Sequence, residues 1–249
     1  MFDLSVVHII LVLICALLIG VAKTGLPTLG ILVVAVMASI FPARDSIGIV
    51  LPMLITADVI AVTYYRRNVN WKTLFRLVPW VLGGLFLGFI VLFFVEASRP
   101  IEIMLGGIIL LMIGIQLSRE RWGASWAENI PQSTWFAAGM GTLAGFTTMI
   151  GNAAGPVMAI FLLAIALPKQ EFIGTGAWFF ISVNLIKVPM YAILGLITPA
   201  SLTFNLWLAP VILLGTYLGI KCLPLIPQRT FNIAVLVLAV FGGVRLLVG

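Results

Sequence analysis

The sequence predicts an all-α integral membrane protein made of two inverted repeats of five hydrophobic segments each, with broken or re-entrant helical hairpins that meet near the membrane midplane. Three observations lead to this prediction: the composition, the spacing of the apolar runs and an internal repeat. Of the 249 residues, 62% are hydrophobic and only 9% are charged, and the mean hydropathy is +1.23. Soluble domains contain about 45–50% apolar and about 25% charged residues. The composition therefore indicates a chain that lies in a membrane.

Apolar runs between polar residues or Gly and Pro breaks divide the chain into ten segments. They cover residues 4–22, 26–41, 47–65, 73–95, 100–118, 134–150, 152–167, 172–196, 203–222 and 229–248. The first run has no basic residues before it and no small-residue cleavage pattern after it, so we expect it to remain as a membrane segment rather than a signal peptide. The segments form a first membrane repeat over residues 1–118, a cytoplasmic linker over residues 119–133 and a second membrane repeat over residues 134–249, within one integral domain.

The second segment of each half is short. Each has 16 residues, which gives a helix of about 24 Å, less than the hydrocarbon thickness of about 30 Å. We therefore expect half-helices or legs of re-entrant hairpins at residues 26–41 and 152–167.

An internal repeat relates the two halves. The stretch FPARDSIG in the first half corresponds to LPKQEFIG in the second. Proline, glycine and acidic residues align in one register between the two halves. In so apolar a sequence leucines align easily by chance, but these residues do not, so their alignment indicates a duplication. A shift of 126 residues aligns Gly25 with Gly151, Pro42 with Pro168, Asp45 with Glu171, Gly48 with Gly174 and Asp58 with Asn184, and after a five-residue insertion a shift of 131 aligns Gly84 with Gly215 and Gly88 with Gly219.

The distribution of Lys and Arg predicts the orientation. With residues 66–76 placed in the cytoplasm, the other loops alternate and the basic residues are biased to the inside. Both termini then face outward, and because each half has an odd number of passes, the halves have opposite orientations. Inverted repeats are typical of secondary transporters. Nine basic residues lie inside (Arg66, Arg67, Lys72, Arg76, Arg119, Arg121, Lys169, Lys221, Arg229) and three lie outside (Arg44, Arg99, Arg245).

The breaks AKTGLPTLG, residues 22–30, and TTMIGNAAGP, residues 147–156, lie at the tips of the predicted hairpins. In the first tip, Pro27 lies where a new helix begins, a position that suits proline. Free N–H groups and the positive dipole end of a helix start attract anions, so two facing tips would form an anion site. The candidate substrate-binding residues supply positive charge, hydrogen-bond donors or tight turns: Lys23, Thr24, Gly25, Thr28, Thr147, Thr148, Gly151 and Asn152.

Each tip also has a simpler interpretation. Lys23 can extend from a helix end to the cytoplasmic interface, with TGLP as an ordinary tight turn. The small residues of the second tip can serve close packing of helices.

Asp58 and Lys187 lie about midway along apolar segments, where an unpaired charge costs at least about 2.5–3.5 kcal/mol. Asn184 precedes Lys187 by three residues and shares its helical face. These three residues are candidates for gating or coupling, and an ion pair between Asp58 and Lys187 is one arrangement that the pattern allows. Its role is either a structural salt bridge or part of a gate or of proton coupling. Trp178 is the candidate for a pocket wall.

No group of acid, base and metal ligands indicates a catalytic site, so an enzyme is not expected. The two cysteines, Cys15 and Cys222, fall in apolar runs without metal-site spacing. We expect no metal and no cofactor, and the sequence leaves proton coupling open. The formal charge of +6 does not indicate nucleic acid, because in a membrane protein the location of the charges matters more than their sum.

The chain resembles the TauE/SafE sulfite exporters, also called the four-toluene-sulfonate uptake permeases. The resemblance rests on GVAKTGLPTLGILVV, on FPARDSIGIVLPMLITADVIAVTYYRR and on GFTTMIGNAAGPVMAIFLLAIALPKQEFIGTGAWFFISVNLIKVP, and it covers essentially the whole chain. It implies a multi-pass protein of the bacterial inner membrane that transports sulfite, organosulfonates and related small anions. Many members have a first tip of the GxGGG kind, whereas this chain has KTGLPTLG and resembles a lysine-bearing branch.

We therefore expect a secondary transporter that exports a small anion, sulfite or an organosulfonate, by alternating access. A passive anion channel, and a transporter of a small carboxylate or another sulfur-containing anion, are the alternatives. The expected partners are the small anion and membrane lipid, with a homodimer left open and nucleic acid excluded.

Overall fold

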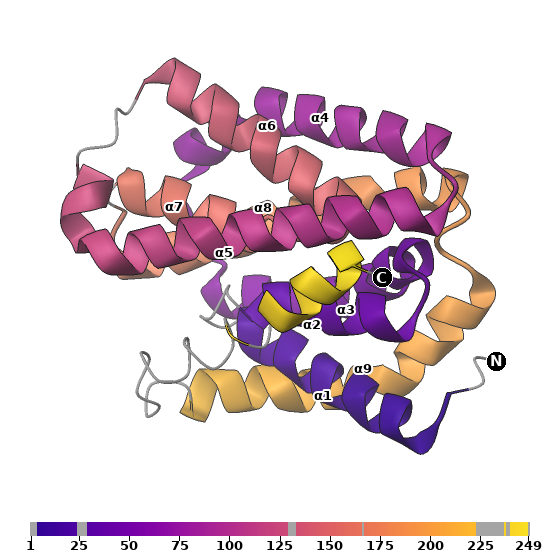
Figure 1. Ribbon diagram of the computed structural model, residues 1–249. Helices are drawn as coiled ribbons and strands as arrows, with labels where there is room; N and C mark the ends of the chain where they lie inside the picture. Colours follow the sequence, from indigo (N-terminus) through magenta and orange to yellow (C-terminus); the bar gives the residue numbers. More distant parts are fainter. Residues whose placement is uncertain are drawn as a thin grey trace.

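The computed structural model describes residues 4–23, 29–128, 133–165, 167–222, 237 and 240–248. Within these ranges the chain forms nine numbered helices and a further helical stretch at residues 240–248, with no strand (Figure 1), so the all-α prediction is confirmed. The helices are α1 (Val6–Lys23), α2 (Leu29–Ile40), α3 (Ala43–Tyr65), α4 (Trp71–Phe94), α5 (Ser98–Glu128), α6 (Thr134–Gly151), α7 (Gly155–Ala164), α8 (Lys169–Ile193) and α9 (Pro199–Cys222).

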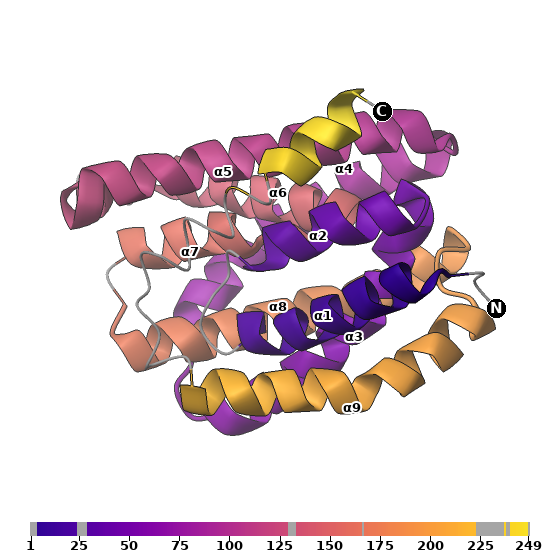
Figure 2. The same ribbon diagram turned by 60° about the horizontal axis from the view of Figure 1, so that its bottom comes forward.

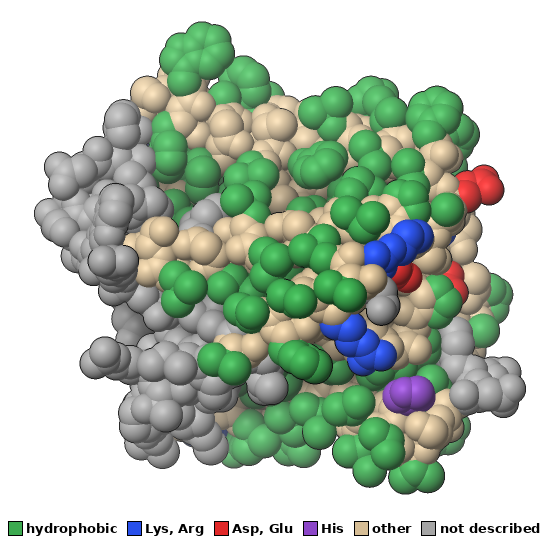
Figure 3. Space-filling model, viewed as in Figure 1, with side chains coloured by type: hydrophobic (Ala, Val, Ile, Leu, Met, Phe, Trp, Pro, Cys, Tyr) green, Lys and Arg blue, Asp and Glu red, His purple; other side chains and the backbone are tan. Residues whose placement is uncertain are grey.

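Five of the described helices are long and apolar enough to cross a membrane: α1, α3, α4, α8 and α9. The protein is therefore a multi-pass membrane protein, as predicted. On the face shown in Figure 3, hydrophobic side chains are spread over the described part of the surface, and charged side chains gather toward the right-hand end. On α4, Phe75, Phe86 and Phe94 are 68%, 60% and 78% exposed, which suits a helix that faces lipid rather than water.

The second helix of each half is short, as the sequence predicts. Helix α2 has 12 residues and α7 has 10, so at about 1.5 Å per residue neither reaches the thickness of about 30 Å of a hydrocarbon core. Helix α7 begins three residues later than predicted, because Asn152 adopts a left-handed conformation with φ of 55° and ends α6. Figure 2 shows α2 and α7 between α5 above and α1, α8 and α9 below.

Helix α5 is longer than predicted. It runs from Ser98 to Glu128, so residues 119–128 of the predicted linker are helical. The polar stretch RERWGASWAE consists mostly of residues with good or neutral helix propensity, so the helix continues beyond the end of the apolar run.

Helices of the first half pack against helices of the second. Helix α4 packs on α6, α1 packs on α9, and α3 packs on α8. Two glycines allow these backbones to approach closely: a Cβ atom on Gly84 of α4 would clash with the carbonyl oxygen of Thr142, and one on Gly215 of α9 would clash with that of Leu17. In Figure 1, α1 runs from right to left and α6 from left to right.

A second pair of glycines does the same for the loops. A Cβ atom on Gly48 of α3 would clash with the carbonyl oxygen of Leu196, which follows α8, and one on Gly174 of α8 would clash with that of Asn68, which follows α3. The N-terminal part of α3 therefore contacts the loop after α8, and the N-terminal part of α8 contacts the loop after α3.

Candidate functional site

A cavity of about 420 Å³ lies between the two halves of the chain. Residues of α1, α2, α3, α6, α7, α8 and α9 line it. Much of the wall is apolar, with side chains such as Ile31, Leu54 and Met158. The polar side chains of the wall lie on α1, α3, α6, α8 and at the end of α6: Lys23, Asp58, Tyr65, Thr148, Asn152 and Asn184.

Lys23 is the last residue of α1, where the negative end of the helix dipole favours a cation. Its Nζ lies 2.7 Å from Oδ1 of Asp58, and its side chain is 11% exposed. The same Nζ lies 4.1 Å from the centroid of the Phe180 ring, a cation–π contact. Lys23 therefore points into the protein. The simpler interpretation of the sequence, in which Lys23 extends to the cytoplasmic interface, does not agree with this position.

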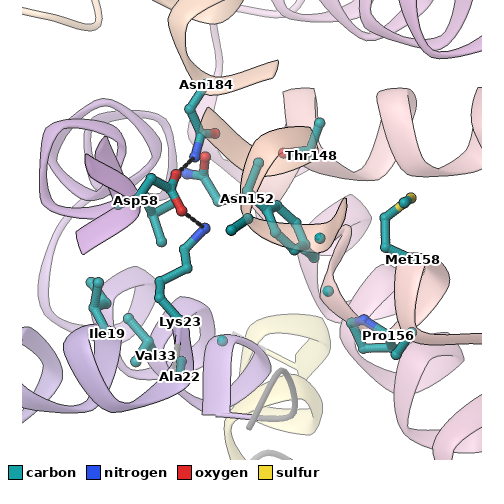
Figure 4. Close-up of a pocket in the computed structure, with 18 of the residues that line it drawn as sticks. Ile19, Ala22, Lys23, Val33, Asp58, Thr148, Asn152, Pro156, Met158 and Asn184 are labelled. Atoms are coloured by element: carbon teal, nitrogen blue, oxygen red, sulfur yellow. Dashed lines mark hydrogen bonds and ion pairs between the residues drawn. The ribbon is translucent and has the colours of Figure 1, made fainter. Parts of the chain in front are cut away.

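Asp58 lies in the interior of α3 and is fully buried. Its Oδ2 accepts a hydrogen bond of 2.6 Å from Nδ2 of Asn184 on α8. Figure 4 shows the Asp58 carboxylate between Lys23 on one side and Asn184 on the other. A buried carboxylate needs such partners, because an isolated charge in a low-dielectric interior is strongly unfavourable.

Lys187 is fully buried behind the cavity wall. Its Nζ donates to Oδ1 of Asn152 at 2.5 Å, to Oγ1 of Thr148 at 3.3 Å and to Oδ1 of Asn184 at 3.4 Å. Among the described residues, no carboxylate lies within ion-pair distance of this ammonium. The ion pair between Asp58 and Lys187 that the sequence allowed is therefore not formed. Asn184 lies between them and Lys23 takes the place of the partner.

Asn152 connects three helices. Its backbone N–H donates to the carbonyl oxygen of Thr148 at 3.0 Å and ends α6. Its Nδ2 donates to the carbonyl oxygen of Ile47 on α3 at 3.1 Å, and its Oδ1 accepts from Lys187 on α8. Asparagine is one of the few residues that tolerate the left-handed conformation found here.

The other predicted site residues are placed differently. The Thr147 hydroxyl donates to the carbonyl oxygen of Leu143 in its own helix at 2.8 Å, so it is not turned toward the cavity. A Cβ atom on Gly151 would clash with the Leu105 side chain, which matches the alternative that small residues of this tip serve packing. Thr24, Gly25 and Thr28 lie outside the described residues.

Trp178 does not form the predicted wall. Its ring packs on Trp71, with centroids 5.1 Å apart, and on the described part of α8 the aromatic residues that line the cavity are Phe172 and Phe180. The sequence analysis missed Phe180 and the ion pair between Lys23 and Asp58. The opposite charges of Lys23, in a break between apolar segments, and Asp58, within one, are the signal that could have suggested that pair.

The electrostatic balance of the site is positive. With Lys23, Lys187 and Asp58 ionised, these three side chains carry a formal net charge of +1, and among the described residues Lys187 has no carboxylate at ion-pair distance. Charges interact strongly where water is excluded. This excess favours a small anion over a cation in the cavity, and the Thr148 hydroxyl and the amides of Asn152 and Asn184 offer polar contacts beside it.

Comparison with known protein families gives one match. The family model described as sulfite exporter TauE/SafE matches residues 12–246, nearly the whole chain. Neither the comparison with curated proteins nor that with solved structures found a match.

Proposed function

The chain belongs to the sulfite exporter TauE/SafE family, and from this premise we propose that it is a secondary transporter that exports a small anion, sulfite or an organosulfonate, across the bacterial inner membrane. Transport proceeds by alternating access, in which the cavity opens to one side of the membrane at a time. The protein performs no chemistry on the anion and needs no metal or cofactor.

One observation carries the choice of an anion. Two lysines and one aspartate, with a formal net charge of +1, lie in or directly behind the wall of a cavity between the halves of the chain. An excess of positive charge in a water-poor site attracts an anion and repels a cation. A site for a cation would require the opposite balance, with carboxylates in excess.

Contacts between equivalent positions support an inverted-repeat mechanism. Asp58 and Asn184, which are 126 residues apart and correspond to each other in the repeat, share a hydrogen bond. Gly48 and Gly174, also equivalent, each contact the loop that ends the other half's central helix. In a transporter of this kind the substrate site lies where the repeats meet, near the membrane midplane, and the repeats rock about it.

The polar network joins the helices that would move. Asp58 on α3 binds Asn184 on α8, and Lys187 of α8 binds Asn152 at the end of α6. We assign these residues to the gate, because a change at the anion site reaches α3, α6 and α8 through these hydrogen bonds.

Flux measurements with the purified protein in liposomes test this proposal. We expect saturable movement of radiolabelled sulfite that is accelerated by unlabelled sulfite on the opposite side, because an alternating site returns faster when it is loaded. Flux without saturation or exchange would identify a passive channel instead. Lys23→Met and Lys187→Met should each lower the flux, whereas Lys72→Met, which changes an exposed lysine in the first turn of α4, serves as the matched control.

A further inference from the structure

We propose that Asp58 is the internal counter-ion that the transported anion displaces from Lys23, and that a proton bound to Asp58 makes this displacement favourable, so that each anion travels with one proton. This inference rests on the proposed function, and it assigns the coupling ion and the residue that carries it.

The geometry places Asp58 where an anion would bind. Its carboxylate lines the cavity, and Oδ1 takes the position 2.7 Å from the Lys23 ammonium. Lys23 is the cation of the cavity wall, since Lys187 lies behind Asn152, Thr148 and Asn184. When an anion enters the cavity, the Asp58 carboxylate therefore already occupies the place beside the Lys23 ammonium that the anion would take.

A second negative charge beside Asp58 is unfavourable at this depth. Two like charges that share a buried site cannot both remain ionised without a large cost, and the usual outcome is that one of them is protonated. A transported sulfonate is a far stronger acid than a carboxylic acid, so Asp58 is the group that takes the proton. Protonation removes the negative charge from Oδ1, releases Lys23 and leaves the anion as its new counter-ion.

The charge balance of the cycle supports one proton for each monoanion. With Lys23, Lys187 and Asp58 all ionised, the empty site carries a formal charge of +1. The loaded site holds the two lysines, a neutral Asp58 and the anion, which is again +1. Because the charge of the site does not change on loading, both forms face the same electrostatic cost when the helices move through the membrane.

The other described groups near Asp58 are less suited than Asp58 to carry the proton. Helix α1 contributes Lys23 and α8 contributes Lys187 and the amide of Asn184. Helix α2 has no ionisable residue, and α9 lines the cavity with Gly219 and Ile220. On α5, Arg99 and Glu102 pair with each other. Tyr65, at the end of α3, is the remaining titratable side chain of the described wall.

The decisive experiment uses methanesulfonate, which remains a monoanion throughout the pH range in which proteins are stable. Its affinity for the wild-type protein in detergent is measured by calorimetry between about pH 6 and about pH 8, in buffers of different ionisation enthalpy. We expect uptake of about one proton per anion, and an affinity that falls by up to about ten-fold per pH unit where Asp58 is ionised in the empty protein. Binding of methanesulfonate without proton uptake would overturn the inference.

Variants locate the proton. Asp58→Asn should abolish proton uptake and bind methanesulfonate at about pH 8 at least about ten-fold more tightly than the wild type, because no carboxylate competes for Lys23. Asp45→Asn, an exposed position in the first turn of the same helix, should keep the wild-type affinity and proton uptake, and Tyr65→Phe should keep the proton uptake. Proton uptake that survives in Asp58→Asn, or that disappears in Tyr65→Phe, contradicts the assignment. If Asp58→Asn does not fold, the wild-type proton count decides.

The same preparation separates this inference from the proposed function. If neither sulfite nor methanesulfonate binds or moves, the proposed function itself fails. If sulfite moves but methanesulfonate neither binds nor moves, the function stands and the inference fails, because displacement of Asp58 requires only a small monoanion.

Discussion

At the scale of single residues, Lys23 and Asp58 depend on each other for a stable buried position. Lys23→Met leaves a buried carboxylate without its cation, and Asp58→Asn leaves a buried ammonium without its anion, so each single change should lower the free energy of unfolding by about 3–5 kcal/mol. The double variant removes both charges and should lose clearly less than the sum of the single losses. Unfolding in mixed detergent micelles, without added anions, measures all four proteins. Additive losses would show that the two side chains do not stabilise each other.

Asn184 offers a way to change the charge of the site with little change of shape. Asn184→Asp brings the net charge of the cluster from +1 to zero and replaces the amide that donates to Asp58. We expect sulfite affinity to fall at least about ten-fold, because a new carboxylate takes over the role of the anion beside Lys187. Asn68→Asp, the same substitution in the loop after α3, is the matched control. Unchanged sulfite binding in Asn184→Asp would remove the net charge as the basis of anion selection.

The sequence identified the charged residues of the site but not their pairing. Asp58 and Lys187 are recognisable because a charge within an apolar segment is costly, and Lys23 because it lies in a break between two apolar segments. Which lysine contacts Asp58 depends on how α1, α3 and α8 are rotated about their axes, and apolar segments in a membrane protein give a weak signal for rotation.

Trp178 and Phe180 illustrate this problem of rotation. Side chains two positions apart in an α-helix, such as Trp178 and Phe180, point about 200° apart around the helix axis. When Phe180 lines the cavity, Trp178 therefore faces away from it, toward Trp71. A sequence in which both positions are aromatic cannot tell which of them faces inward.

At the scale of the helices, the contact between α4 and α6 depends on a glycine. Gly84→Ala would place a Cβ atom against the carbonyl oxygen of Thr142, which is backbone and cannot turn aside. Overpacking of this kind typically costs about 1–3 kcal/mol. The neighbouring Gly83 has nothing within 4 Å of the position of a Cβ atom, so Gly83→Ala should be neutral or stabilise the helix by up to about 1 kcal/mol. Thermal unfolding in detergent compares the two, and equal effects would contradict this view of the interface.

The sequence predicted which helices form more accurately than it predicted where they end. The breaks around residues 22–30 and 147–156 correctly predicted the short helices α2 and α7. At the second break it is Asn152, in a left-handed conformation, that ends α6. Proline alone does not mark such a break, since Pro52 and Pro79 lie inside α3 and α4. The end of α5 was placed too early, since the apolar run marks where the chain leaves the apolar region and not where the helix ends. The stretch to Glu128 stays helical through its own helix propensity.

At the scale of the whole molecule, the two halves are not separate bodies. Helix α1 packs on α9, α4 packs on α6 and the site itself takes residues from both halves. The repeat in the sequence predicts which positions of the two halves are equivalent, but not which helix of one half packs on which helix of the other. That pairing depends on how the helix surfaces with glycines fit together. A cavity shared in this way responds to any movement of one half against the other.

The sidedness of the chain provides a test of the entire arrangement. Helix α4 connects the loop at residues 66–70 to that at residues 95–97, and α5 leads from there to Glu128. If α4 and α5 each cross the membrane once, Arg67 and Ser125 lie on one side and Ala97 on the other, and the excess of basic residues places the first two in the cytoplasm. In a background without Cys15 and Cys222, a membrane-impermeant thiol reagent applied to intact cells should label Ala97→Cys but neither Arg67→Cys nor Ser125→Cys. Inverted vesicles should give the reverse. Labelling of Arg67→Cys and Ser125→Cys from opposite sides would exclude this topology, and with it the inverted repeat on which alternating access depends.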